Sequence, residues 1–192
     1  MLSCVGLLFF ATNPVWSQDS DQTFVWQPYD ETAEPLQQTE HEIPRIRFKL
    51  FNSKYLDKNL LWNAFTEELS DFTAQDYQAL KPLILEQDIP SLQRAVAEQR
   101  LSYEQLVKFY LYRIRLFESD NSRSLNAIIA TNPNVIVEAR RKDRARSAAS
   151  LVISEQSLFG IPVLLKDNIG AEGMPTTAGA VALRATIEKM LL

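Results

Sequence analysis

The sequence holds a single cysteine, Cys4, and a single histidine, His41, among its 192 residues. One cysteine cannot form an internal disulfide. A Ser-His-Asp hydrolase, or a zinc site made of several His and Cys ligands, is hard to assemble from this set. Any hydrolytic chemistry would therefore use a base other than histidine.

The chain also has little net charge. Twenty Lys and Arg against 24 Asp and Glu leave a formal net charge of -4, which gives no electrostatic basis for a nucleic-acid partner. Hydrophobic residues make up 46% of the chain and charged residues 23%, as in globular proteins. The length is enough for one domain with a core.

No Lys or Arg precedes Arg45. The apolar run 2–11 is too short to span a bilayer as a helix, so we expect no stable membrane span. The run fits the central region of a secretory signal, and Val15-Trp16-Ser17 fits its cleavage site. We therefore predict a signal peptide over 1–17 and a secreted or periplasmic protein. The alternative is a buried amino-terminal strand or helix, and the missing basic residues leave the translation start open.

Residues 18–42 carry seven acidic residues, no Lys or Arg, and two prolines. This composition predicts an acidic, flexible leader. The folded part is expected over 43–192.

Periodicity after residue 43 predicts alternating helices and strands, and therefore the α/β class. Pro82 is expected to kink or split the second helix, and Ser91 is expected to cap the third. The predicted strands are 45–50, 125–130 and 161–165, and the predicted helices are 57–70, 74–86, 91–100, the helix after Ser102, 132–150 and 180–191.

The helix after Ser102 has the strongest signals. Gln105 stands three residues after Ser102, the spacing of a capping box. The apolar stripe favours a core face over a ligand groove; it comprises Tyr103, Leu106, Tyr110, Ile114 and Phe117. In the helix over 132–150, which Asn132-Pro133 should begin, five basic residues are interspersed with acidic ones and favour a solvated face.

Lys166 lies where the predicted strand 161–165 ends and a loop rich in Gly and Thr begins. Active sites of α/β folds occur at such places. Desolvation would favour the neutral amine, which could act as a general base. The alternative is a surface lysine paired with its neighbour Asp167.

The segment 160–169, Gly-Ile-Pro-Val-Leu-Leu-Lys-Asp-Asn-Ile, followed by Gly-Met-Pro-Thr-Thr-Ala-Gly at 173–179, resembles the lysine segment of the amidase-signature family. Upstream, 106–114, 125–129 and Asn132-Pro133 resemble the same family. The resemblance runs from about 88 to about 184. It implies a mixed sheet covered by helices, of which this chain would hold the amino-terminal helices and first strands.

The resemblance implies hydrolysis of carboxamides by a Ser–cis-Ser–Lys triad whose lysine is Lys166. The lysine exchanges a proton with the cis serine, which relays it to and from the nucleophilic serine, and backbone N–H groups stabilise the oxyanion. This chemistry implies no metal and no cofactor. Asp167 and Asn168 match family positions too, and we expect them to hold the loop through bonds to backbone N–H groups.

The family's two serines lie several tens of residues downstream of the lysine, and this sequence contains no Gly-Ser-Ser-Gly segment. Ala180 also stands where the family often has serine. We therefore expect an amino-terminal fragment of an exported amidase, truncated and inactive alone, which would take a small amide substrate if completed. Alternatives are a non-enzymatic interaction fragment and a subunit of a tRNA-linked amidotransferase, which the export signal disfavours. The substrate and oligomeric state stay open.

Overall fold

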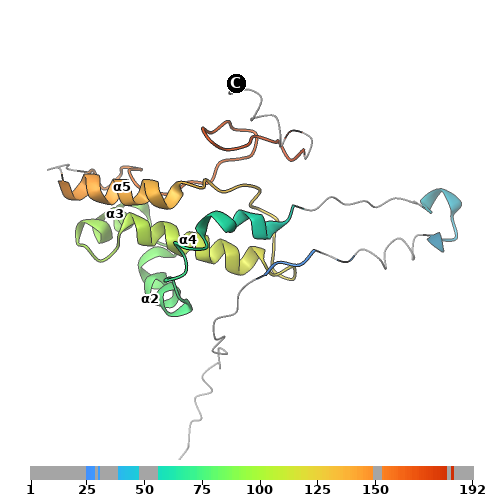
Figure 1. Cartoon of the computed structure of the whole chain (residues 1–192), viewed down its shortest axis with the longest axis horizontal. Helices are drawn as coiled ribbons and strands as arrows, with labels where there is room; N and C mark the ends of the chain where they lie inside the picture. Colours follow the sequence, from blue (N-terminus) through green and yellow to red (C-terminus); the bar gives the residue numbers. More distant parts are fainter. Residues whose placement is uncertain are drawn as a thin grey trace, which may run out of the picture.

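The structure is a computed structural model that describes residues 25–28, 30, 39–47, 56–148, 153–180 and 183. Its body is a packed group of helices (Figure 1). The α-helices are α2 (Ala74–Ile84), α3 (Ile89–Ala97), α4 (Tyr103–Glu118) and α5 (Val135–Ala148). Short 3-10 helices precede them: η1 (Pro44–Ile46), η2 (Lys58–Leu61) and η3 (Asn63–Phe65).

Helix α4 lies at the centre of the core. Tyr103, Leu106 and Phe109 on this helix are fully buried, and α2 and α5 pack against it (Figure 1). The ring of Phe109 stacks on Tyr77 of α2 with 4.8 Å between the ring centres. Aromatic burial of this kind is a large apolar contribution, so α4 is the element around which the other helices are organised.

Local signals place the helix starts. Ser102 and Gln105 form the predicted capping box, with the Ser102 hydroxyl accepting from the Gln105 N–H at 3.0 Å. Helix α3 begins earlier than predicted, because Asp88 and not Ser91 caps it: the Asp88 carboxylate accepts from the Ser91 N–H at 2.8 Å. Helix α2 continues through Pro82 and ends two residues later.

Two other predicted helices differ in the structure: one begins later than expected, and the other is not an α-helix. Asn132 does bond to the following turn, accepting from the Asn134 N–H at 2.9 Å, but α5 starts only at Val135. The segment 57–70 forms 3-10 helices and turns, with no α-helix. Apolar residues at helical spacing thus predict burial more reliably than they predict an α-helix.

The α/β prediction is wrong for the part of the chain that the structure describes, which contains no strand and no mixed sheet. Residues 125–130 and 161–165 have no ladder partner. In the first predicted strand, 45–50, residues 45 and 46 belong to η1, while 48–50 lie outside the described residues. A strand requires a neighbour for its backbone hydrogen bonds, which an apolar run alone does not supply. Leu164 in the third run is 79% exposed.

None of the helices among the described residues is both long and apolar enough to cross a membrane. The predicted signal peptide, 1–17, lies outside the described residues, as does most of the helix predicted over 180–191.

Candidate active site

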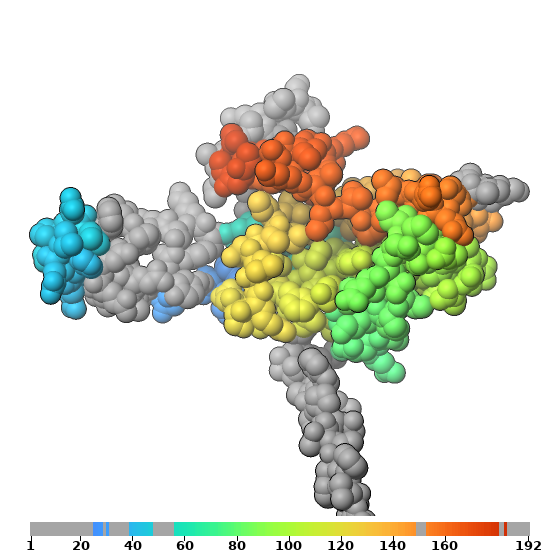
Figure 2. Space-filling model, turned by 180° about the vertical axis from the view of Figure 1, so that it is seen from behind, coloured from blue at the N-terminus to red at the C-terminus, as the bar shows by residue number. Residues whose placement is uncertain are grey.

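An apolar groove of about 1040 Å³ lies between α4 and the segment that carries Lys166. One wall is a side of α4 with Tyr110, Ile114 and Phe117, continued by residues 127–132. The other wall is formed by 162–169 and by the loop that follows. Figure 2 shows this segment, in orange to red, lying on one side of the helical body. The size and apolar lining of the groove suit a small organic ligand.

The predicted stripe on α4 is therefore divided between two environments. Tyr103 and Leu106 are core residues, whereas Tyr110, Ile114 and Phe117 are half-buried and line the groove. The interpretation of the stripe as core is correct for Tyr103 and Leu106 and in part for Tyr110, which packs against the core as well as lining the groove. Sequence reasoning has no separate signal for the groove, because its residues on α4 have the spacing of a core face.

Lys166 lines this groove and is exposed. Its carbonyl accepts from the Ile169 N–H at 2.9 Å, which starts the turn after the extended segment. In the part of the chain that the structure describes, its ammonium group has no hydrogen bond and no ion pair. The alternative of a lysine paired with Asp167 is thus not seen, since the Asp167 carboxylate has other partners.

Asp167 closes the loop after Lys166. Its carboxylate accepts from the Thr177 N–H at 3.0 Å, the Thr177 hydroxyl, and the Gly179 N–H at 2.9 Å. Its carbonyl accepts from the Ala178 N–H at 3.0 Å. Thr177 is buried by this arrangement. Asp167 has the loop-holding role expected of it, whereas Asn168 is exposed and its side chain has no hydrogen bond among the described residues.

The carboxylate of Asp167 gains stability in its ionised form. The hydrogen bond from the Thr177 hydroxyl, then those from the backbone N–H groups of Thr177 and Gly179, hold the pKa of Asp167 below its ordinary value. Because the pKa is lowered in the folded loop, these hydrogen bonds contribute fully to its stability above the ordinary Asp pKa of about 3.9. That contribution is lost as the pH falls through the lowered pKa.

We predict that Asp167→Asn weakens the hydrogen bonds that close this loop at neutral pH. The neutral side-chain amide has one acceptor oxygen in place of the two charged oxygens of the carboxylate, and its NH2 group can only donate. The amide proton of Gly179 should shift upfield in NMR spectra in the variant, and in the unsubstituted chain as the pH falls through the lowered pKa of Asp167. Asn168→Ala, one residue along, is the matched control and should leave the Gly179 signal unchanged. A Gly179 signal at pH 7 that is the same in Asp167→Asn and in the unsubstituted chain would contradict the assignment.

No group of three or more His, Cys, Asp or Glu side chains among the described residues is arranged to hold a metal ion. The polar side chains of the groove are those of Lys166 and the loop after it on one wall, and those of Arg113, Glu118, Thr131 and Asn132 on the other; the rest of the lining is largely apolar.

Residues 105–190 match the amidase family model. The chain is 37% identical over 105 residues to a probable amidase of Arabidopsis thaliana, covering 54% of this chain and 20% of that protein. Its fold resembles the crystal structure of an amidase family protein from Bacillus anthracis strain Ames, with a TM-score of 0.58 and 32% identity over 66% of this chain and 24% of that one. The chain thus spans about a fifth of the curated relative and a quarter of the solved one.

The matched segment contains both walls of the groove, α4 from Gln105 onward and the loop of Lys166. The resemblance noted in the sequence is therefore confirmed: residues 105–190 are similar to the amidase family, and the relatives that the chain matches in part are amidases.

Proposed function

We propose that this chain is the amino-terminal part of an exported amidase that hydrolyses the C–N bond of carboxamides, with Lys166 as the base of a Ser–cis-Ser–Lys triad. The observation that carries the proposal is the position of Lys166 on an apolar groove inside the segment that matches the amidase family. A carboxamide with an apolar acyl or amine part would fit such a groove.

The role of Lys166 follows from the chemistry that the family resemblance implies. A neutral lysine accepts a proton from the cis serine, which takes one from the nucleophilic serine as that oxygen attacks the amide carbon. The proton then passes to the leaving amine. Water next attacks the acyl-enzyme and gives its proton to the relay, which returns it to the oxygen of the nucleophilic serine as the acid leaves. A lysine base works best away from water, whereas Lys166 is exposed here.

Both serines must come from residues outside this sequence, since its 192 residues hold no Gly-Ser-Ser-Gly segment. We infer that the groove is completed by the further part of an amidase domain, which would cover Lys166. The 192-residue chain alone is then expected to lack amidase activity.

The test uses two proteins and one panel of aryl and fatty amides. The purified 192-residue chain should give no turnover above background. A hybrid, in which residues 56–180 replace the corresponding segment of the Bacillus anthracis amidase family protein, should give turnover if that protein itself acts on the panel. Any turnover by the purified chain alone would contradict the proposal, as would a folded but inactive hybrid when the parent protein acts on the panel.

A non-enzymatic interaction fragment is the second candidate. The observation that favours it is the exposure of Val163, Leu164 and Leu165, since runs of exposed apolar residues mark interaction surfaces. The hybrid separates the two candidates: a catalytic segment gives a hybrid with amide turnover, whereas an interaction fragment gives a folded hybrid without it.

Export is a separate part of the proposal. It rests on the apolar run 2–11 and the site at Val15-Trp16-Ser17. When the chain is produced with its natural amino terminus in a bacterial host, the exported protein should begin at Gln18 or close to it. Mass spectrometry of the secreted or periplasmic fraction measures this. A protein that keeps Met1 and stays in the cytosol would refute export without affecting the assignment of Lys166.

A further inference from the structure

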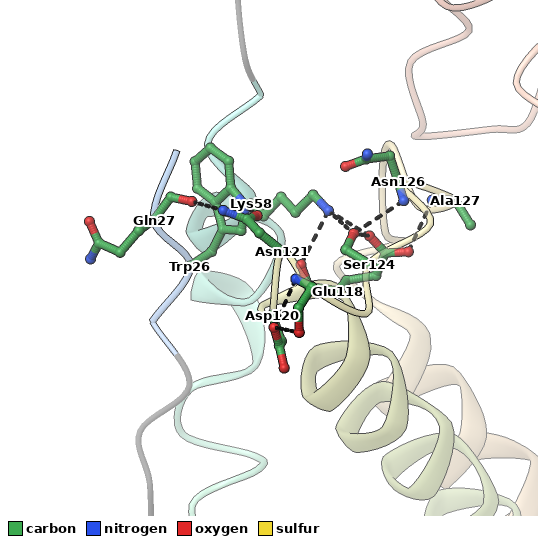
Figure 3. A network of polar contacts seen from close by, with 10 residues as sticks. Trp26, Gln27, Lys58, Glu118, Asp120, Asn121, Ser124, Asn126 and Ala127 are labelled. Atoms are coloured by element: carbon green, nitrogen blue, oxygen red, sulfur yellow. Dashed lines mark hydrogen bonds and ion pairs between the residues drawn. The ribbon is translucent and has the colours of Figure 1, made fainter. Parts of the chain in front are cut away.

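Residues 25–28 lie against a corner of the helical body formed by η2 and the turn after α4 (Figure 3). Trp26 is only 7% exposed, although it comes from an acidic segment that precedes the body by about thirty residues. Burying a tryptophan removes a large apolar area from water and favours a fixed contact over a transient one.

Two asparagine side chains hold this segment. The Asn59 carboxamide accepts from the Trp26 N–H at 2.9 Å and donates to the Trp26 carbonyl at 3.0 Å. It thus pairs with the peptide backbone as a neighbouring strand would. The Asn121 carboxamide accepts from the indole N–H at 2.8 Å and donates to the Gln27 carbonyl at 2.7 Å. One asparagine therefore recognises extended backbone, and the other recognises a tryptophan side chain.

Contacts that do not involve residues 25–28 hold the Asn59 side chain and the turn that carries Asn121. Asp57 accepts from the Asn59 N–H and from the Asn59 side chain, both at 2.9 Å. Asn121 lies in a turn whose first residue, Asp120, accepts from the Ser122 N–H at 2.9 Å and from the Arg123 guanidinium at 2.6 Å. The walls of the corner are thus formed within residues 57–127.

A buried ion pair joins the two walls. The Lys58 ammonium lies 2.6 Å from the Glu118 carboxylate, and both side chains are almost fully buried. Lys58 also donates to the Ser124 hydroxyl and to the Glu118 carbonyl (Figure 3). These contacts tie η2 to the end of α4 and do not include Trp26, so we expect the separation of Asn59 and Asn121 to be independent of Trp26.

We propose that the Asn59–Asn121 corner is a preformed binding site for an extended peptide that carries a tryptophan, and that its occupant is Trp26-Gln27 of the same chain. The acidic segment is then a strap that this site holds to the body through Trp26 and Gln27. Cleavage after Ser17 would leave Trp26 in the mature protein and the strap in place. Phenylalanine would fit the apolar part of the site but would leave the Asn121 carbonyl oxygen without its donor.

The test uses the full chain with Trp26→Ala, which empties the site, and a labelled synthetic peptide of residues 23–30. Fluorescence anisotropy should show saturable binding. The peptide with Phe in place of Trp26 should bind about fivefold more weakly, the effect of one hydrogen bond. The peptide with Ala should bind more than about 50-fold more weakly, because the indole burial is lost as well. The unsubstituted chain should bind the peptide less than Trp26→Ala does.

Asn121→Ala, added to the Trp26→Ala chain, is the control for the site and should weaken binding at least about fivefold. Circular dichroism must show helices in each variant. Equal binding of the Trp and Ala peptides would overturn the proposal, as would the absence of saturable binding to a folded Trp26→Ala chain.

A second measurement does not depend on Trp26→Ala folding. In the unsubstituted chain the Trp26 amide and indole protons should be protected from exchange, and Trp26→Phe should keep amide protection. Unprotected Trp26 protons would overturn the site. Protection that disappears on dilution would show that a second copy supplies the tryptophan, which would overturn the same-chain assignment.

Discussion

Lys166→Ala in the hybrid amidase is expected to lower kcat/KM by a factor on the order of 1,000 or more, by analogy with other catalytic triads. Lys166 would be the base that finally takes up the proton from the serines and returns it. Its removal leaves the serines without a base. Steady-state kinetics on the best amide of the panel, before and after the substitution, measure the loss.

Two further variants define the result. Lys166→Arg keeps the positive charge but cannot give up its proton in a protein, so it should be about as inactive as the alanine variant. Lys81→Ala, on the exposed side of α2, is the matched lysine control and should keep full activity. A hybrid that retains more than about a tenth of its kcat/KM after Lys166→Ala would remove Lys166 from the mechanism.

Lys58→Met is expected to destabilise the fold by about 3–5 kcal/mol, the usual cost of leaving one partner of a buried ion pair alone. Glu118 would then be a buried carboxylate without its cation. Burial alone raises the pKa of Glu118, but the hydrogen bonds from Lys58, Ser124 and the Ala127 N–H outweigh burial and lower it. Urea unfolding followed by circular dichroism measures the change in the free energy of unfolding.

The double variant Lys58→Met/Glu118→Leu is the control, because exchanging both charges for apolar groups often costs little. It should be more stable than Lys58→Met alone. Since the pKa of Glu118 is lowered on folding, the contribution of the pair should be present above the ordinary Glu pKa of about 4.3 and should be lost as the pH falls through the lowered value. A Lys58→Met variant as stable as the unsubstituted chain would show that the pair contributes nothing.

The features that sequence predicts well in this chain are local ones. The capping box of Ser102 and Gln105 spans four residues, and the segment around Lys166 identifies the family within twenty. Such signals need no knowledge of distant parts of the chain. The loop-holding role of Asp167 is also local, since its partners Thr177 and Gly179 follow within twelve residues.

The features that sequence reasoning misses depend on distant partners. Apolar runs such as 161–165 predict strands, but the ladder partner that defines a strand is absent among the described residues. Burial of Trp26 cannot be foreseen in an acidic segment, because Asn59 and Asn121 lie 33 and 95 residues away. The groove side of α4 has the pattern of a core face, because periodicity shows which residues share a face and not what covers that face.

The hydrogen bonds of Asp167 turn the dozen residues that follow Lys166 into a closed ring. The hydrogen bonds that close the ring lie at its base, next to Lys166. Gly170 and Gly173 are on its far side, where a side-chain carbon added to either would meet no other atom within 4 Å. Because lengthening a closed loop adds little entropic cost, residues inserted near Gly173 would enlarge the ring and leave its base in place. This part of the groove could thus change in length and chemistry between related chains while the lysine keeps its position.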